Sequence, residues 1–213
     1  MIWVFGDSFS TIWENMYGLG ITYKEYKGYQ PKIFSHYLST MLDTTVNQYG
    51  NGGVDNNTIF DCIIDNIDSI TTNDIVIIGW TEPSRFRLEK NNKWATIRNS
   101  DLNLESYKFI DITTLQQIRI NRMSRLYWDE IVNWSKLIST IFELKGVKVI
   151  FWSPFALCTD VHLKKQLLPT DWYIGTLLNR LQDETNGVIN DAHFSELGHA
   201  ELANIFYTKI NKL

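Results

Sequence analysis

Two short motifs near opposite ends of the chain carry residues whose types suit nucleophilic catalysis. Near the start, the apolar run Ile2 to Phe5 stops at Gly6-Asp7-Ser8, which is typical of a buried strand that ends in a turn and presents a serine. Near the other end, Asp191 stands two residues before His193. A serine that attacks a carbonyl needs a base to take its proton and an acceptor to orient that base. Ser8, His193 and Asp191 supply one residue for each role.

Both motifs also have ordinary structural explanations, and other histidines compete for the role of base. Gly-Asp-Ser is a common turn sequence, and acidic and polar residues often begin a helix. His36 lies in a predicted helix, His162 in a segment without periodicity, and His199 in the first turns of a predicted C-terminal helix. We favour His193 because an Asp close to it on a tight turn can accept from Nδ1–H and leave Nε2 free.

Donors for a developing oxyanion are also present in the sequence. The backbone N–H of Ser8 is one candidate. The segment 50–57 holds three glycines among Asn and Asp residues, a composition that brings backbone N–H groups close to a ligand. An ordinary glycine-rich turn is the alternative interpretation. Either way, Gly52 and Gly53 follow a predicted strand, where ligands of open α/β sheets tend to bind.

Strands and helices alternate along the chain, which predicts βαβ units and a mostly parallel sheet in one domain, 1–213. The run Ile75 to Trp80 is continuously apolar, as in a strand buried on both faces. The predicted elements are strands at 2–5, 46–49, 75–80 and 147–152, a hairpin around 91–92, and helices at 31–43, from 56 or 57 to 67, 113–144, 174–181 and from 195 onward. Asn56 or Asn57 is expected to cap the second of these helices, and Ser195 the last one. The segment 16–30 is predicted to be a loop that overhangs Ser8.

Composition argues against several classes of function. The net charge is −4 and no long basic run occurs, so neither nucleic acid nor an anionic membrane is an expected partner. Cys62 and Cys158 lie in apolar runs without metal-ligand spacing, and a disulfide between them stays open. We expect no metal and no cofactor. The sequence lacks a signal-peptide pattern and a membrane-spanning run, so we expect a cytoplasmic or virion-associated protein.

Taken in order along the chain, these motifs resemble those of the SGNH (GDSL-type) hydrolases. The resemblance rests on Gly6-Asp7-Ser8 after the first strand, the glycine loop between Asn47 and Asn56, Gly79 after the third strand, and Asp191-x-His193. It implies a three-layer α/β/α sandwich around a parallel sheet. It also implies hydrolysis or transfer of acyl esters without a metal.

The resemblance makes Ser8 the nucleophile, His193 the general base and Asp191 the orienting acid. It makes the N–H groups of Ser8 and Gly53 the oxyanion donors. Gly53 is preferred over Gly52 because Gly53-Val54-Asp55-Asn56 fits the Gly-x-x-Asn register of the family.

Two positions depart from the family pattern. The family has Asp three residues before the His, where this chain has Asn190, so either Asn190 or Asp191 orients the imidazole, and Asp191 is preferred. After the third strand the family has Gly-x-Asn-Asp, and here Thr81 stands where the Asn side chain donates to the oxyanion. A lost donor typically costs a factor of about 10²–10³ in rate. Thr81, Asn56 or Arg85 is therefore expected to substitute, or activity is weak.

The expected function is an SGNH-type serine esterase that acts on a small acyl ester, such as O-acetyl on a carbohydrate. Gly-Trp-Thr at Gly79 to Thr81 is also similar to a subgroup of SGNH-like proteins found in phage. Two alternatives stay open: a weak or inactive SGNH-like module that binds carbohydrate or joins an assembly, and an O-acyltransferase. Arg85 and Arg87 are candidates to bind an acidic substrate group, against the simpler interpretation that each forms a surface ion pair.

Overall fold

The sheet at the centre of the molecule contains four parallel strands in the order β2-β1-β3-β6. The computed structural model describes residues 1–82, 85–90, 93–97, 113, 125–154 and 178–212. The strands are β1 (Ile2–Gly6), β2 (Val46–Gly50), β3 (Ile75–Gly79) and β6 (Lys148–Trp152). All four were predicted within one or two residues of these bounds. Because β2 and β3 pair on opposite sides of β1, the carboxyl end of β1 lies at a topological switch point, where open α/β sheets bind ligands.

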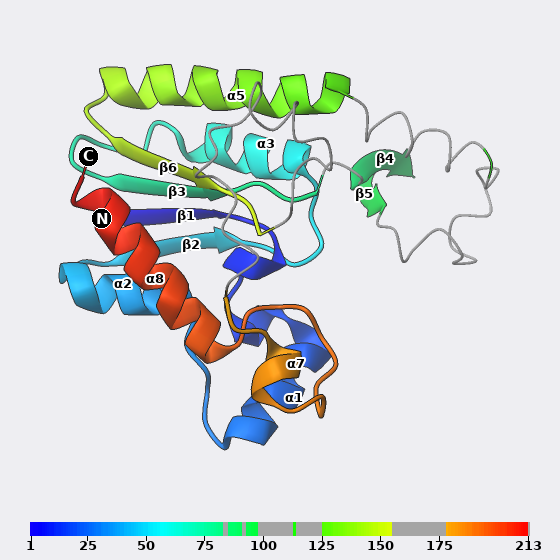
Figure 1. The fold of residues 1–213 in the computed structure, drawn as a ribbon. Coiled ribbons are helices and arrows are strands. Elements are labelled where there is room, and N and C mark those ends of the chain that lie inside the picture. Colours follow the sequence, from blue (N-terminus) through cyan, green and yellow to red (C-terminus); the bar gives the residue numbers. More distant parts are fainter. Residues whose placement is uncertain (83–84, 91–92, 98–112, 114–124, 155–177, 213) are drawn as a thin grey trace.

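Helices cover both faces of the sheet and complete three layers (Figure 1). One face is covered by α3 (Asn56–Asn66) and α5 (Arg125–Leu144), and the other by α2 (Phe34–Leu42) and α8 (Glu196–Ile210). The predicted α/β/α arrangement with a parallel sheet is therefore confirmed. The end of α2 near Asp43 and the Ser195 cap of α8, which accepts from the N–H of Gly198 at 3.1 Å, are also as predicted.

Alternation along β1 divides the core into two apolar clusters. Trp3 and Phe5 pack toward α3 and α5, whereas Ile2 and Val4 pack toward α2 and α8. Each fully buried side chain of this size contributes roughly 1.5–3 kcal/mol relative to an exposed one. Trp80 and Trp152 are completely buried in these clusters, so they belong to the core and not to the floor of a cleft.

The predicted cap of α3 is wrong by one or two residues. The residue that caps the helix is Asp55, whose Oδ1 accepts from the N–H of Thr58 at 2.9 Å, and the helix begins at Asn56. An Asp carboxylate is among the preferred N-cap acceptors. The side chain of Asn56 is instead turned toward Thr81, with which it forms two hydrogen bonds.

The predicted loop over 16–30 is also wrong for most of its length, because residues 17–27 are helical. A short 3₁₀ turn, η2 (Trp13–Asn15), leads into α1 (Tyr17–Lys27). One of the glycines that suggested a loop, Gly20, serves close packing, because a Cβ on it would lie 1.9 Å from the carbonyl oxygen of Trp13. A third apolar cluster fixes the helix, and it contains Trp13, Tyr23, Ile33, Leu181 and Ile189. Tertiary packing here outweighs the low helix propensity of glycine.

The remaining elements agree in part with the predictions made from the sequence. An antiparallel hairpin, β4 (Phe86–Lys90) with β5 (Lys93–Ile97), flanks positions 91–92 as predicted. The start of the helix predicted at 113–144 and the segment 157–169 lie largely outside the described residues, as do His162 and Cys158. In the stretch predicted as a helix at 174–181, residues 178–180 are not helical, and α7 (Leu181–Glu184) begins only where the predicted helix ends.

Cys62 is half-buried and free. Within the described part of the chain, no helix has both the length and the apolar character needed to cross a membrane.

His199 occupies an unusual position in the core. It lies on α8, is 2 % exposed, and contacts the rings of Trp13, Phe34 and Phe194. Its Nδ1 has no hydrogen-bond partner among the described residues. Burial, together with the nearby histidines His193 and His36, lowers the pKa of His199 to about 3. The folded protein therefore holds this imidazole neutral at every pH of physiological interest.

This burial makes the stability of the fold depend on pH. An unfolded chain protonates histidine below a pKa of about 6.5, so between pH 6.5 and 3 the unfolded state binds more protons at His199 than the folded state does. The free energy of unfolding is expected to fall with falling pH in this window, by up to about 1.4 kcal/mol per pH unit from this residue. His199→Phe should flatten the dependence, as measured by urea unfolding between pH 7 and pH 4. Parallel curves for the two proteins would contradict the assignment.

Candidate active site

The structure brings together the three residues that the sequence singled out. Nε2 of His193 lies 2.7 Å from Oγ of Ser8, although the two residues are 185 positions apart. Nδ1 of the same ring lies 2.5 Å from Oδ1 of Asp191, which also accepts from the backbone N–H of His193 at 2.8 Å. This is the arrangement in which a histidine that takes a proton from serine is oriented by a carboxylate.

Ser8 is placed by the end of β1. The strand stops at Gly6, and Asp7 then caps a 3₁₀ turn, η1 (Ser8–Ser10), by accepting from the N–H of Phe9 at 3.0 Å. This turn packs tightly on the end of β2: a Cβ on Gly50 would lie 2.2 Å from the carbonyl oxygen of Ser10. Ser8 is consequently held with only 9 % of its surface exposed, at the carboxyl edge of the sheet.

His193 lies in the loop between α7 and α8, and backbone hydrogen bonds fix the loop. The N–H groups of Leu181 and Gln182, at the start of α7, donate to the carbonyl oxygens of His193 and Asp191 at 2.9 and 3.3 Å. Nη1 of Arg180 donates to the carbonyl oxygen of Ala192 at 2.7 Å. The ring of Phe9 stacks on the imidazole with 4.5 Å between centroids. The roles of Phe9 and Arg180 were not predicted, because neither residue belongs to a motif that can be recognised in the sequence.

The carboxyl group of Asp191 is kept ionised by its partner. Burial by itself would raise its pKa, but the hydrogen bonds from His193 and the charge of that residue outweigh burial and lower the pKa. A carboxylate at this position favours the tautomer with the proton on Nδ1, which leaves Nε2 as an acceptor toward Ser8. Asn190, the alternative candidate, is exposed.

Three backbone N–H groups close to the end of the sheet find no acceptor among the residues that the structure describes. Those of Ser8, Gly52 and Gly53 donate to no other residue in the part of the chain that the structure describes. Gly53 is half-buried, whereas Gly52 is exposed. Unpaired N–H groups are what an oxyanion site requires.

The other predicted oxyanion residues are instead gathered around Asp7. Thr81 donates its hydroxyl proton to Oδ2 of Asp7 at 2.7 Å, and Nη1 of Arg85 lies 3.3 Å from the same oxygen. Asn56 accepts from the N–H of Thr81 at 2.8 Å and donates to its carbonyl oxygen at 3.0 Å. A hydroxyl has one proton, so Thr81 has none left for an oxyanion in this arrangement. The structural role of Asp7, which is 1 % exposed, was not predicted.

The two arginines after β3 form ion pairs, which was the simpler of the two interpretations of these residues. Arg85 pairs with Glu82 at 3.3 Å as well as with Asp7. Arg87 pairs with Asp61 of α3 at 2.5 Å. Among the described residues, no group of three or more His, Cys, Asp or Glu side chains is arranged as a metal site.

A cavity of about 540 Å³ opens beside this edge of the sheet. Its walls come from the ends of β1 and β2, the loop that follows β2, the first turns of α3, and η2. The apolar part includes Phe5, Tyr49 and Val54, and the polar part includes Glu14 and Asn15. The volume is in the range of small-molecule binding sites.

Comparison with known proteins adds little to this description. No protein-family model matches the chain, and no curated protein matches it. One solved structure is similar over 97% of each chain, with 13% sequence identity and a TM-score of 0.34: a protein from Desulfitobacterium hafniense DCB-2 provisionally assigned to the lipolytic G-D-S-L family. At these values the likeness does not establish a family.

The contacts of Asp7 predict the effect of removing the Thr81 hydroxyl. Thr81→Val deprives a buried carboxylate of a donor, so the free energy of unfolding should fall by about 1–3 kcal/mol. Thr81→Ser retains the hydroxyl and should lose less. Urea unfolding of both variants measures the difference. A Thr81→Val protein as stable as the Thr81→Ser protein would show that the hydrogen bond to Asp7 does not support the fold.

Proposed function

We propose that this protein is a serine esterase of the SGNH type that hydrolyses a small acyl ester. The observation that carries the proposal is the unbroken line of contacts from Asp191 through His193 to Ser8, at 2.5 and 2.7 Å. The position of Ser8 at the switch point of a parallel sheet supports the same conclusion.

In the proposed reaction, Oγ of Ser8 attacks the ester carbonyl while Nε2 of His193 takes its proton. The tetrahedral intermediate collapses, the bond to the alcohol breaks, and His193 returns the proton to the departing oxygen. Water then attacks the acyl-serine, again losing a proton to His193. Release of the acid returns that proton to Oγ of Ser8. Asp191 accepts the Nδ1 proton of His193 throughout and offsets the charge of the imidazolium.

The proposed oxyanion donors are the N–H groups of Ser8 and Gly53, with Gly52 as the second choice for the glycine. Within the described ranges these N–H groups have no other acceptor, which supports this assignment. The hydroxyl of Thr81 is occupied by Asp7, and Asn56 is occupied by Thr81. The site therefore works with two donors, and each donor typically contributes a factor of about 10²–10³ in rate.

The cavity supports a carbohydrate as the alcohol part of the ester. Ser8 and His193 do not line it, but its walls include Gly6, two residues before Ser8, and Val54, which follows the glycine pair. Aromatic side chains beside a carboxylate and amides suit a sugar ring, because its C–H face is apolar and its hydroxyls need hydrogen-bond partners. A small acyl group, such as acetyl, then needs little space at Ser8.

Two other functions use the same residues. An O-acyltransferase would pass the acyl group from Ser8 to a sugar hydroxyl in place of water, and analysis of the products separates it from a hydrolase. A weak or inactive carbohydrate-binding module is favoured by one observation, the engagement of Thr81 with Asp7. Such a module would leave Ser8 unreactive.

The proposal predicts which serine reacts. Ser8→Ala and His193→Ala should each lower kcat on p-nitrophenyl acetate by roughly 10³-fold or more. Ser10→Ala is a matched control, because Ser10 is buried in the same turn and its hydroxyl has no hydrogen-bond partner among the described residues. A fluorophosphonate should label Ser8 in the wild-type and Ser10→Ala proteins. Equal rates in all four proteins, or no labelling, would contradict the proposal and favour the inactive module.

The cavity predicts a separate effect on substrate binding. Glu14→Ala combined with Asn15→Ala removes two polar groups from its wall, so KM for an acetylated methyl glucoside should rise about tenfold, the equivalent of 1.4 kcal/mol. The rate on p-nitrophenyl acetate should not change. Glu25→Ala, on the exposed side of α1, is the control. An unchanged KM for the sugar ester would exclude this cavity as the sugar site.

A further inference from the structure

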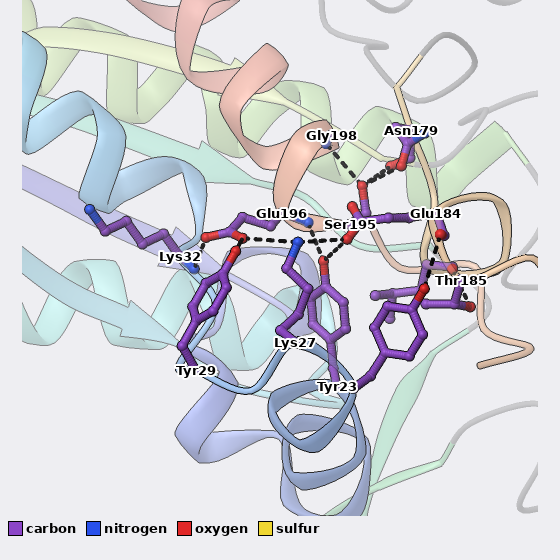
Figure 2. A network of polar contacts seen from close by, with 12 residues as sticks. Tyr23, Lys27, Tyr29, Lys32, Asn179, Glu184, Thr185, Ser195, Glu196 and Gly198 are labelled. Atoms are coloured by element: carbon purple, nitrogen blue, oxygen red, sulfur yellow. Dashed lines mark hydrogen bonds and ion pairs between the residues drawn. The ribbon is translucent and has the colours of Figure 1, made fainter. Parts of the chain in front are cut away.

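The loop 185–195, which carries Asp191 and His193, is bounded by two glutamates that both contact the same helix. Glu184 is the last residue of α7 and Glu196 is the first residue of α8. Their side chains converge on α1 and on the residues that follow it, as Figure 2 shows. α1 is the segment predicted to be a loop, and no part of the proposed chemistry uses it.

Tyr23 connects the two ends of the loop directly. Its ring is completely buried in the cluster that also contains Leu181 and Ile189. Its hydroxyl donates to Oε1 of Glu184 at 2.9 Å and accepts from the backbone N–H of Glu196 at 2.8 Å. One oxygen atom therefore ties the end of α7 to the start of α8.

Lys27 connects the same two ends by charge. Its Nζ lies 3.0 Å from Oε1 of Glu184 and 3.4 Å from Oε2 of Glu196 (Figure 2). Burial would raise the pKa of each glutamate, but the hydrogen bonds that each receives outweigh burial and lower the pKa. Both carboxylates are thus charged at neutral pH, and a single ammonium group lies between them.

Glu196 is held by two further donors that follow α1 in the chain. The hydroxyl of Tyr29 donates to Oε2 at 2.6 Å, and the backbone N–H of Lys32 donates to Oε1 at 3.0 Å. Inside the loop, the hydroxyl of Thr185, which is 1 % exposed, accepts from the N–H of Ile189 at 3.0 Å. The loop is therefore fixed at both ends and also within its first half.

We propose that α1 is a clamp that sets the position of His193, with Tyr23 and Lys27 as its positioning residues. The proposal rests on the proposed function, because its purpose is to hold Nε2 within reach of Ser8. The loop has no strand or helix of its own to hold the imidazole. A shift of about 1 Å in a reacting group can lower a rate about a hundredfold, so the two ends of the loop must be fixed.

The clamp is tested by removing its contacts one at a time. Tyr23→Phe removes the bridging hydroxyl and keeps the buried ring, and Lys27→Met removes the charge and keeps the length of the side chain. Each should lower kcat on p-nitrophenyl acetate by about ten- to a hundredfold, with little change in KM. Lys27→Arg should recover most of the loss, because a guanidinium can pair with both carboxylates. Lys24→Met on the exposed side of α1 and Tyr207→Phe on α8 are the matched controls.

A second readout does not depend on esterase activity. The proton in the short contact between Nδ1 of His193 and Asp191 should give a downfield ¹H NMR signal in the wild-type protein, absent in His193→Ala. This signal should broaden or disappear in Tyr23→Phe and Lys27→Met and persist in both controls. The NMR result stands even if the wild-type protein shows no esterase activity, which would contradict only the proposed function.

Thermal unfolding of each variant shows whether it is folded when assayed. If Lys27→Met does not fold, Tyr23→Phe and Tyr29→Phe provide the test. Folded variants that retain both the wild-type kcat and the downfield signal would overturn the clamp. Loss of the signal in Lys24→Met or Tyr207→Phe as well would also overturn it, because the effect would then not be specific to these contacts.

Discussion

The contact between His193 and Asp191 is the constraint on which the site depends. An imidazole can accept a proton from Ser8 only if its other nitrogen is held, and a carboxylate at 2.5 Å holds it here. Asp191 and His193 both lie in a loop, so the chain must fix that loop by contacts from elsewhere. Backbone N–H groups at the N-terminus of α7 donate to the carbonyl oxygens of Asp191 and His193, and the ring of Phe9 stacks on the imidazole. The aromatic stack also joins η1 to the loop, so Ser8 and His193 are positioned by adjacent residues.

A second carboxylate, Asp7, holds together the residues that follow β1 and β3. Its buried oxygens receive the N–H of Phe9, the hydroxyl of Thr81 and the guanidinium of Arg85. Removing one partner of a buried charge lowers the stability of the fold, so these residues have a structural role. The same contacts leave the backbone N–H groups of Ser8 and the glycine pair as the proposed oxyanion donors. The hydrogen bonds that hold Asp7 in place are therefore also the reason why few donors are left for an oxyanion.

Much of the fold could be predicted because it depends on local patterns. Apolar or largely apolar runs of four to six residues marked β1, β3 and β6, the glycine-rich segment 50–57 marked the end of β2, and helical spacing marked α2, α3 and α8. The prediction failed at α1, where the segment contains glycines that indicate a loop in isolation, but Gly20 serves close packing against Trp13. It also failed at the cap of α3, because Asn56 and Asp55 are equally good candidates until the contact with Thr81 is seen.

The sequence by itself determined where the four parallel strands and the helices α2, α3 and α8 lie along the chain, and it marked Ser8, Asp191 and His193 as candidates for one site. This was possible because residues at the ends of parallel strands meet at one edge of a sheet. Only the tertiary structure decided what each polar group contacts. Thr81 lies beside Asp7, and Lys27 lies between Glu184 and Glu196, through contacts between residues far apart in the chain. Hydrogen bonds are short and directional, so no periodicity or spacing in a sequence specifies which partner a side chain reaches.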